Sequence, residues 1–328
     1  MNNAFHYDGR TVTLVVNPTS GRGRAGRLLP RVCADLLTAF PELHLRVHRT
    51  TSFAEARLRC IQAVDAARPA GVDHPADSLV VMGGDGMAHL GVNACAGTEV
   101  PLGVIPAGTG NDFCRGAGLP TSIAPAIEAV GMGRARRMDV AKVTGALVGG
   151  AQERFVGSVV STGYDARVTR RANAIPSRLG GLGYGWAAIA ELSTFEPLRY
   201  RLTLDGREED LHAMLVAVGN AGVFGGGMRI CPEARVDDGR LDVTIIHPVS
   251  RATLLRLLPT TYTGGFVKDP AVELRTANAV RIDGDGLFGM ADGEDLGAVP
   301  LNVRCLPGSL LVLDGDRGPD GGTEPGPR

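Results

Sequence analysis

Residues 78–86 read Ser-Leu-Val-Val-Met-Gly-Gly-Asp-Gly, a short apolar run that ends in a glycine-rich turn. A helical pattern follows at residues 87–96, so the turn is expected to join a strand to a helix. The same order recurs twice: the run at 11–16 leads into Asn17-Pro18-Thr19-Ser20-Gly21-Arg22-Gly23-Arg24, and the run at 102–105 leads into Gly108-Thr109-Gly110-Asn111-Asp112. This repetition predicts an α/β domain with a parallel sheet.

The remaining segments of residues 1–136 fit the same domain. A further strand is predicted at 43–48, and further helices at 25–39, 53–67, 112–116 and 122–130. Because crossovers between parallel strands are right-handed, the loops after the strands should lie along one edge of the sheet, where such folds bind ligands.

The pattern changes after residue 136 to strand-like stretches separated by turns. Strands are predicted at 138–143, 155–161, 198–204, 212–219, 241–247 and 279–283, and Asp205-Gly206 is a hairpin signal. Helical patterns interrupt them at 183–192 and 251–261. Residues 137–313 are therefore expected to form a mainly antiparallel second domain, and the Gly-, Pro- and Asp-rich tail 314–328 to be disordered.

Composition excludes several classes of protein. The 328 residues are 44% hydrophobic and 21% charged, with a net charge of -1, so two ordinary globular domains are expected and no nucleic-acid partner. The six cysteines lack metal-ligand spacing, and the N-terminus lacks a signal-peptide pattern, which indicates a cytoplasmic protein. No window is apolar enough to span a membrane, so any membrane contact should be peripheral. The chain has neither a P-loop motif nor protein-kinase motifs.

The three glycine-rich turns suit phosphate binding. Glycine permits positive φ and close backbone approach, so that several N–H groups can converge on one phosphate, and Arg22, Arg24 and Arg27 could supply positive charge. Asp85 and Asp112 lie inside two of the turns and would repel a bare phosphate, but they fit a phosphate bound with Mg²⁺. The alternative is that each turn needs glycine for its geometry alone.

These motifs resemble the diacylglycerol kinase catalytic-domain family, which includes sphingosine and ceramide kinases, and in particular its soluble bacterial lipid-kinase branch. The resemblance extends to about residue 313. Its other carriers are Phe113 and Arg115, Gly225-Gly226-Gly227-Met228, the stretch from Pro232-Glu233-Ala234 to Asp242, and Asp292-Gly293-Glu294. Met87 departs from the family pattern, which usually has threonine there.

The resemblance implies an α/β nucleotide-binding domain of the NAD kinase and phosphofructokinase type, followed by a mainly antiparallel β-sandwich domain. The active site would lie in the cleft between them, and the last strand could return to the first domain. ATP and Mg²⁺ would be bound by Asn17, Ser20, Gly21, Arg22, Gly83, Gly84, Asp85, Gly86, Gly108, Thr109, Asn111, Asp112, Arg115 and Asp139. For Asp139, a polar residue that merely opens a strand is the alternative.

The resemblance also implies a catalytic role for Asp292, as the carboxylate that accepts the proton of the acceptor hydroxyl, with Glu294 assisting. Phosphoryl transfer needs such a group, although an acidic surface turn would have the same sequence. Asp237 and Asp238 would hold a structural Mg²⁺, and a plain hairpin turn is the alternative.

Residues 167–186 combine Arg167, Arg170, Arg171 and Arg178 with Tyr184, Trp186 and aliphatic side chains. This mixture suits an anionic membrane surface, although a solvated arginine face is equally compatible. The implied function is transfer of the γ-phosphoryl of MgATP to the hydroxyl of diacylglycerol, by a cytoplasmic enzyme that associates reversibly with the membrane. The alternatives are another lipid alcohol, an NAD kinase-like activity or a non-catalytic nucleotide sensor. A homodimer is left open.

Overall fold

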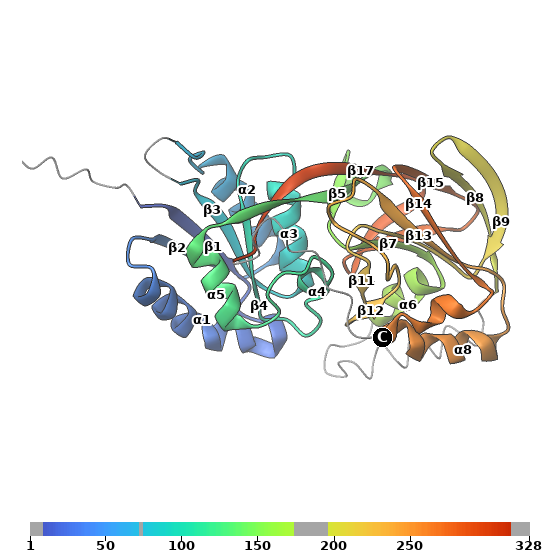
Figure 1. The fold of residues 1–328 in the computed structure, drawn as a ribbon, viewed down its shortest axis with the longest axis horizontal. Helices are drawn as coiled ribbons and strands as arrows, with labels where there is room; N and C mark the ends of the chain where they lie inside the picture. The colour runs from blue at the N-terminus through green and yellow to red at the C-terminus, as the bar shows by residue number, and fades with distance from the viewer. Residues whose placement is uncertain (1–8, 72–74, 174–195, 316–328) are drawn as a thin grey trace, which may run out of the picture.

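The computed structural model describes residues 9–71, 75–173 and 196–315, which form two domains side by side (Figure 1). The first domain contains four parallel strands: β1 (Thr11–Val16), β2 (His44–Arg49), β3 (Ser78–Gly83) and β4 (Leu102–Pro106). Their order across the sheet is β4-β3-β1-β2. Strands β1, β3 and β4 are buried along their whole length because helices cover both faces of the sheet.

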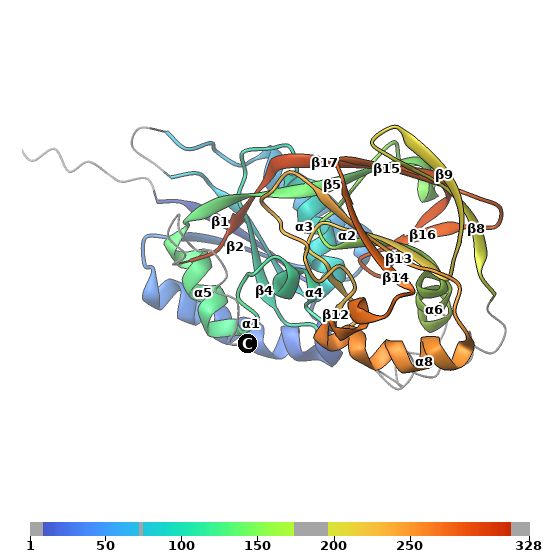
Figure 2. The ribbon, with the colours of Figure 1, turned by 45° about the vertical axis from the view of Figure 1, so that its right-hand side comes forward.

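The helices of this domain are α1 (Ser20–Ala39), α2 (Phe53–Asp65), α3 (Asp85–Cys95), α4 (Asp112–Gly116) and α5 (Ile123–Met132). Alternate strand residues point to opposite faces, so Val80 packs with α1 and α5, whereas Val81 packs with α2 and α3. Figure 2 shows α1 and α5 together on one side of the sheet. The N-terminus of α2 is capped by Ser52, whose hydroxyl accepts a hydrogen bond from the Glu55 N–H.

The second domain is mainly antiparallel. Its strands are β5 (Ala135–Leu147), β6 (Arg154–Val156), β7 (Val159–Gly163), β8 (Leu198–Leu204), β9 (Arg207–Ala213), β10 (Leu215–Gly219), β11 (Val223–Phe224), β12 (Met228–Arg229), β13 (Leu241–Ile246), β14 (Val272–Ala277), β15 (Ala279–Asp283), β16 (Phe288–Ala291) and β17 (Glu294–Leu313). Helices α6 (Tyr164–Asn173) and α8 (Arg251–Thr260) lie side by side below these strands (Figures 1 and 2). Short 3₁₀ helices occupy Val148–Gly150, Thr261–Thr263 and Gly265–Lys268.

Strands β5 and β17 connect the domains. They pair antiparallel from Ala135 opposite Leu313 to Leu147 opposite Gly297, and the far end of β17 pairs parallel with β4, where Val312 lies opposite Leu102. In Figure 1 the two strands run together along the top of both domains. The residue that precedes β17 by two positions is Asp292, so this strand fixes the position of Asp292 relative to the first domain.

The predicted order of an α/β domain followed by a mainly antiparallel β domain is confirmed. The strands predicted at 11–16, 198–204 and 279–283 agree with β1, β8 and β15 residue for residue. Two predicted strands are wrong in extent. The stretch 155–161 is divided between β6 and β7, and a Cβ atom placed on Gly157 in this break would lie 2.5 Å from the Phe113 ring. The stretch 212–219 breaks at Met214, between β9 and β10. The predicted helix 183–192 and nearly all of the tail lie outside the described residues.

Candidate active site between the domains

The three glycine-rich loops lie at one edge of the first-domain sheet. They follow β1, β3 and β4, which are parallel neighbours, so their carboxyl ends meet. Backbone hydrogen bonds tie the loops together: Asn17 N donates to Met82 O over 3.2 Å, and Ala107 N donates to Gly83 O over 2.8 Å. The sheet topology therefore brings together the predicted nucleotide-binding residues of all three loops.

Two contacts between the loops leave no space for a side chain. A Cβ atom placed on Gly108 would lie 2.3 Å from Gly84 Cα, and one placed on Gly21 would lie 2.1 Å from Ala107 O. Real Cβ atoms do not approach other atoms so closely. Glycine is therefore required at both positions for the backbones to approach one another, and not for turn geometry alone.

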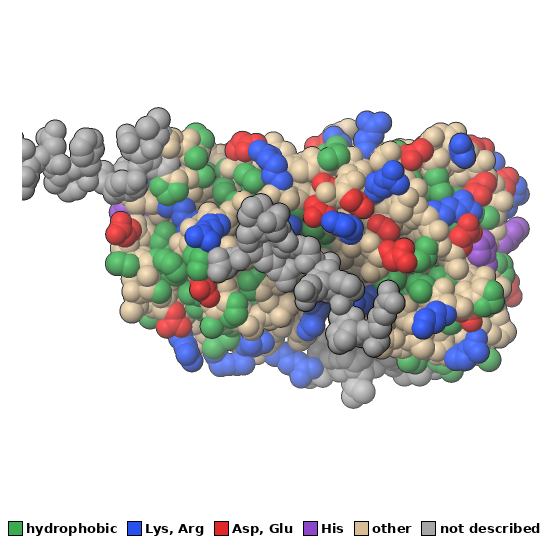
Figure 3. Space-filling model, in the orientation of Figure 1, with side chains coloured by type: hydrophobic (Ala, Val, Ile, Leu, Met, Phe, Trp, Pro, Cys, Tyr) green, Lys and Arg blue, Asp and Glu red, His purple; other side chains and the backbone are tan. Residues whose placement is uncertain are grey.

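The first loop has an unusual backbone. Gly21, Arg22 and Gly23 all have left-handed φ values, of 59°, 58° and 81°. The Asn17 carboxamide oxygen accepts from Thr19 N and Oγ1, which fixes the loop before this bend. Figure 1 shows α1 along the lower edge of the first domain, where Figure 3 shows several basic side chains. The exposed arginines of α1 are Arg22, Arg24, Arg27 and Arg31. They provide positive charge beside the loop.

The third loop is held by its own side chains. Asn111 has a left-handed φ of 54°, and its Oδ1 accepts from Gly108 N over 3.0 Å. Arg115 Nε donates to Gly110 O over 3.1 Å, and its guanidinium is exposed together with Thr109. The loop thus presents Thr109 and Arg115 to the exterior of the domain, where a nucleotide could reach them.

Asp85 and Asp112 form a buried acidic pair at the loops. A Cβ atom on Gly110 would lie 2.9 Å from Asp85 Oδ2 and 3.3 Å from Asp112 Oδ2, so both carboxylates face the same point. Asp85 Oδ1 accepts from Phe113 N, and Asp112 Oδ2 accepts from Gly226 N of the second domain over 2.7 Å. Burial raises the pKa of Asp85 to about 6, with a further increase from the charge of Asp112. Burial also raises the pKa of Asp112.

This pair fits a divalent cation. Asp112 Oδ1 is buried and has no hydrogen-bond partner among the described residues. The pKa of both carboxylates is raised, and a cation between them would favour the ionised form of each at neutral pH. In the described part of the chain no three acidic, His or Cys side chains are grouped so that they could hold a metal. Mg²⁺ commonly binds to one or two carboxylates together with phosphate oxygens and water, which is what this site could offer.

The acidic pair predicts an unusual effect of pH on stability. The pKa of Asp85 is raised from 3.8 to about 6 on folding, so its ionisation disfavours the folded state as the pH rises from about 4 to above 6. Without divalent cations, Asp85→Asn should therefore be more stable than the wild type at pH 7.5, by up to about 3 kcal/mol, and equally stable at pH 4. Urea unfolding in chelator at both pH values measures this difference. If Asp85→Asn were less stable than the wild type at both pH values, the raised pKa of Asp85 would be contradicted.

Asp292 lies on the opposite side of the site, in the second domain. It forms a two-residue turn with Gly293 between β16 and β17, and both residues have left-handed φ values, of 51° and 84°. The turn directs the carboxylate inward, where Oδ2 lies 3.0 Å from His89 Nδ1 and only 7% of the side chain is exposed. The charge of Asp292 contributes to the raised pKa of both Asp85 and Asp112, so the three carboxylates share one site. Glu294, in contrast, is exposed at the start of β17.

His89 and Asn93 are site residues that the sequence interpretation missed. His89 of the first domain contacts Asp292 of the second domain. A signal was available in the sequence. Asp85, His89 and Asn93 recur every four residues on α3, whereas Met87, Ala88, Leu90 and Val92 are buried apolar residues. Polar residues along one face of an otherwise apolar helix indicate that this face makes polar contacts with another part of the protein.

Asp139 has structural partners. Its two carboxylate oxygens accept from Gly308 N and Gly239 N, each over 2.7 Å, and its backbone N–H donates to Val236 O. The side chain is buried at 3% exposure. Both oxygens are thus used to join the turn at Gly239 to the turn at Gly308, and its predicted place in the Mg²⁺–water network remains a prediction.

The variant Asp139→Asn distinguishes a structural role of this carboxylate from its predicted role in the Mg²⁺–water network. An asparagine has one oxygen in place of two. Of the two N–H groups, at Gly239 and Gly308, one would face a neutral acceptor and the other would lose its acceptor. We expect the free energy of unfolding to fall by about 3 kcal/mol. Urea denaturation measures this loss, and the KM for MgATP of the folded variant should be unchanged. Unchanged stability with a raised KM would instead place Asp139 in the nucleotide site.

The turn that contains Asp237 and Asp238 is exposed. Asp237 pairs with Arg235, and Asp238 Oδ1 accepts from Arg240 N. Burial raises the pKa of the neighbouring Asp242 to about 6, with further contributions from Asp238 and Glu233. The carboxylates are thus near enough to interact, and the structural Mg²⁺ remains a prediction.

The arginine-rich segment is only partly described. Arg170 on α6 pairs with Asp295 over 2.8 Å, and its guanidinium lies 3.2 Å above the Phe288 ring. Arg178, Tyr184 and Trp186 lie outside the described residues. No helix in the part of the chain that the structure describes is both long and apolar enough to cross a membrane.

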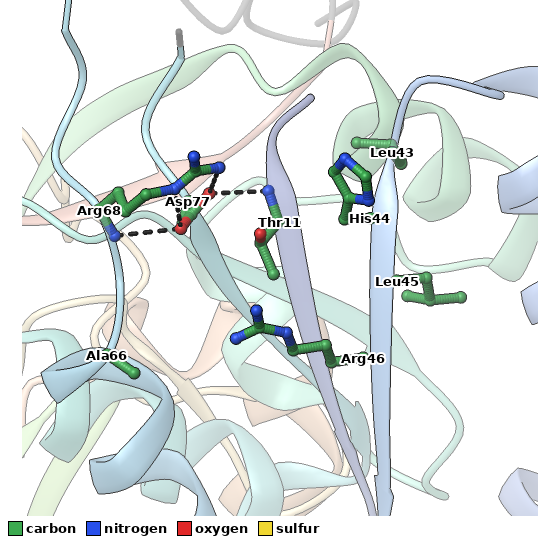
Figure 4. A pocket seen from close by; sticks show the side chains of 8 residues that line it. All are labelled: Thr11, Leu43, His44, Leu45, Arg46, Ala66, Arg68 and Asp77. Carbon is green, nitrogen blue, oxygen red and sulfur yellow. Dashed lines mark hydrogen bonds and ion pairs between the residues drawn. The ribbon is translucent and has the colours of Figure 1, made fainter. Parts of the chain in front are cut away.

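A polar pocket of about 590 Å³ lies far from the three loops, at the amino ends of β1 and β2 (Figure 4). His44 and Arg46 stand on one side of β2, and Asp77 accepts hydrogen bonds from Thr11 N and the Arg68 guanidinium. These bonds close the connection between α2 and β3. Because ligands of such folds bind at the carboxyl ends of the strands, this pocket is not part of the candidate site.

Known proteins share these features. Residues 11–143 match the diacylglycerol kinase catalytic domain, and residues 158–314 match the YegS C-terminal NAD kinase beta sandwich-like domain. A diacylglycerol kinase of Mycobacterium tuberculosis is 35% identical over 304 residues, which are 92% of this chain and 94% of that protein. A crystal structure of a diacylglycerol kinase from Bacillus anthracis has a TM-score of 0.67 at 22% identity, covering 94% of this chain and 97% of that chain. An NAD kinase from Archaeoglobus fulgidus in complex with ATP has a TM-score of 0.50 at 12% identity, covering 93% and 94%.

The architecture is NAD kinase-like, and the predicted fold class is confirmed. The chain belongs to the diacylglycerol kinase family of lipid kinases. Met87, which departs from the usual threonine of that family, is buried beneath Gly83 and packs into the core of the first domain.

Proposed function

We propose that this enzyme transfers the γ-phosphoryl group of MgATP to the free hydroxyl of diacylglycerol, which gives phosphatidic acid and ADP. One observation carries the proposal: a buried carboxylate, Asp292, faces Asp85 and Asp112 from the opposite domain. Its Oδ1 atom is buried and has no partner among the described residues. Phosphoryl transfer to an alcohol requires a proton acceptor opposite the phosphates, and in this proposal Asp292 would be that acceptor.

The loops at 17–24, 83–86 and 108–112 would hold the triphosphate with their backbone N–H groups. Asp85 and Asp112 would hold Mg²⁺, which would neutralise charge on the phosphates. Asp292 Oδ1 would accept the proton of the acceptor hydroxyl while its oxygen bonds to the γ-phosphorus and the bond to the β-phosphate oxygen breaks. Glu294 is exposed, so its proposed contribution is to the entrance of the site.

An apolar pocket beside the site supports a lipid acceptor. It lies between α6, α8 and the sheet, and it is lined by Tyr164, Val168, Leu215, Phe224, Met228, Ile230, Ile246, Leu254, Leu257, Leu258 and Thr261. Phe224 and Met228 flank the turn whose Gly226 N–H binds Asp112, so the pocket adjoins the cleft. Its volume of about 40 Å³ is close to that of a single water molecule, so α8 would have to move to admit an acyl chain.

Access to a membrane lipid would require peripheral binding. The exposed arginines of α1 and the exposed Leu255 and Tyr262 near α8 are suited to an anionic lipid surface. Binding to such a surface should be reversible and weaker at high salt.

The test is phosphoryl transfer from labelled ATP with Mg²⁺ to a panel of lipid alcohols: diacylglycerol, monoacylglycerol, ceramide, a sphingoid base and phosphatidylglycerol. Glycerol serves as the control, because it offers the same kind of hydroxyl without acyl chains. The proposal expects the highest kcat/KM for diacylglycerol and no product with glycerol. A clear preference for another lipid would correct the substrate, and equal transfer to glycerol would remove the role of the apolar pocket.

A further inference from the structure

His89 and Asn93 form a hydrogen-bonded chain that ends at Asp292. The imidazole is buried, with 1% of its side chain exposed, and its Nδ1 atom lies 3.0 Å from Asp292 Oδ2. Its Nε2 atom lies 3.3 Å from Asn93 Nδ2, one helical turn along α3, and the same Nδ2 donates to the His89 carbonyl oxygen over 2.9 Å. The chain thus links the helix that begins at Asp85 to the carboxylate on the other side of the cleft.

The orientation of the Asn93 carboxamide is fixed by strand β6. Asn93 Oδ1 accepts from Phe155 N over 3.0 Å, and Asn93 Nδ2 donates to Phe155 O over 2.8 Å. Exchange of the oxygen and nitrogen atoms would place like groups opposite one another in both bonds. The atom that faces His89 Nε2 is therefore the amide nitrogen, a donor.

This orientation determines where His89 carries its proton. Nε2 faces an N–H₂ group, which cannot accept a hydrogen bond, whereas Nδ1 faces a carboxylate oxygen, which can. We therefore infer that the proton resides on Nδ1. Nδ1–H then donates to Asp292 Oδ2. Oδ2 of Asp292 is thus engaged, whereas Oδ1 of the same carboxylate has no hydrogen-bond partner among the described residues.

We propose that Asn93 and His89 are positioning residues for phosphoryl transfer: Asn93 holds His89 with its proton on Nδ1, and His89 holds Asp292 with Oδ1 toward the acceptor hydroxyl. The inference rests on the proposed function. A two-residue turn alone leaves the Asp292 side chain free to rotate, and the hydrogen bond to His89 selects one orientation. The same bond couples the nucleotide-binding helix to the acceptor side of the cleft.

A matched pair of variants tests the proposal. The amide nitrogen of asparagine at position 89 would lie near the place of Nδ1, whereas that of glutamine would lie near the place of Nε2. His89→Gln should lower kcat for lipid phosphorylation by about 10–100-fold, with little change in KM for MgATP. His89→Asn should lower kcat far less, because its amide nitrogen could still donate to Asp292. His44→Gln, at an exposed histidine on β2, is the control for loss of an imidazole. Equal activity of the Gln and Asn variants would overturn the proposal.

Combination with Asp292→Asn distinguishes positioning from a general structural role. If His89 acts through Asp292, His89→Gln should cause no further loss in the Asp292→Asn background. The same fold-loss in both backgrounds would contradict the proposal.

A measurement without turnover separates this inference from the proposed function. Nitrogen-15 NMR of the wild-type imidazole should show protonated Nδ1 and unprotonated Nε2, and a proton on Nε2 would overturn the inference. If wild-type protein shows this tautomer but phosphorylates no lipid, the proposed function fails while the hydrogen-bonded chain stands.

Discussion

Replacement of Asp292 by asparagine should lower kcat for lipid phosphorylation by about 10²–10⁴-fold and leave MgATP binding intact. Asparagine has the same size and tolerates the left-handed φ of 51°, but it cannot accept a proton. The glycine-rich loops proposed to bind the nucleotide belong to the other domain and should be unaffected. Rapid-mixing kinetics and calorimetric titration with MgATP measure the two quantities separately.

The matched control is Asp205→Asn. Asp205 and Gly206 form a turn of the same kind, with φ values of 47° and 85°, but the Asp205 carboxylate accepts from Asn278 N and Ala279 N and lies outside the site. This variant should keep wild-type kcat. Near wild-type kcat for Asp292→Asn across the pH range would show that Asp292 is not the proton acceptor.

Asp112→Ala should lower kcat/KM for MgATP by on the order of 10²-fold or more, because it removes one of two carboxylates that would hold the cation and also the acceptor of the Gly226 N–H. The affinity for ATP without Mg²⁺ should not fall. It should stay unchanged or rise, because the substitution removes a negative charge beside the phosphates.

Calorimetry with MgATP and with ATP in chelator measures both affinities. Asp35→Ala, at an exposed carboxylate of α1 that pairs with Arg31, is the control and should change neither. If Asp112→Ala weakened both forms of the nucleotide equally, the acidic pair would have no specific role toward the cation.

Local sequence patterns were sufficient to predict that the three glycine-rich loops lie together. Each glycine-rich loop directly follows a valine- or isoleucine-containing strand, and parallel neighbours place their loops together, so the grouping of Ser20, Asp85 and Asp112 follows from topology. The contact of Gly84 with Gly108 also follows, because only glycine permits such an approach.

Contacts between distant segments could not be predicted in this way. His89 and Asp292 are separated by 203 positions, and Asp139 is separated from Gly239 and Gly308 by 100 and 169. No periodicity encodes such pairs. A last strand that returns to the first domain was expected, but the range of β17 was not predicted. Gly297, Pro300, Pro307 and Gly308 interrupt its pattern, and its pairing with β5 is irregular between Ala298 and Leu301 and between Leu306 and Leu310.

The most direct test of the central claim is a competition between acceptors. Purified enzyme receives γ-labelled MgATP together with diacylglycerol in mixed micelles and NAD at equal concentration. The account predicts that the label enters phosphatidic acid, recovered in the organic phase, and that Asp292→Asn gives almost none. Label found in NADP, or released only as inorganic phosphate while diacylglycerol remains unchanged, would contradict the claim that the cleft between the domains phosphorylates a lipid hydroxyl.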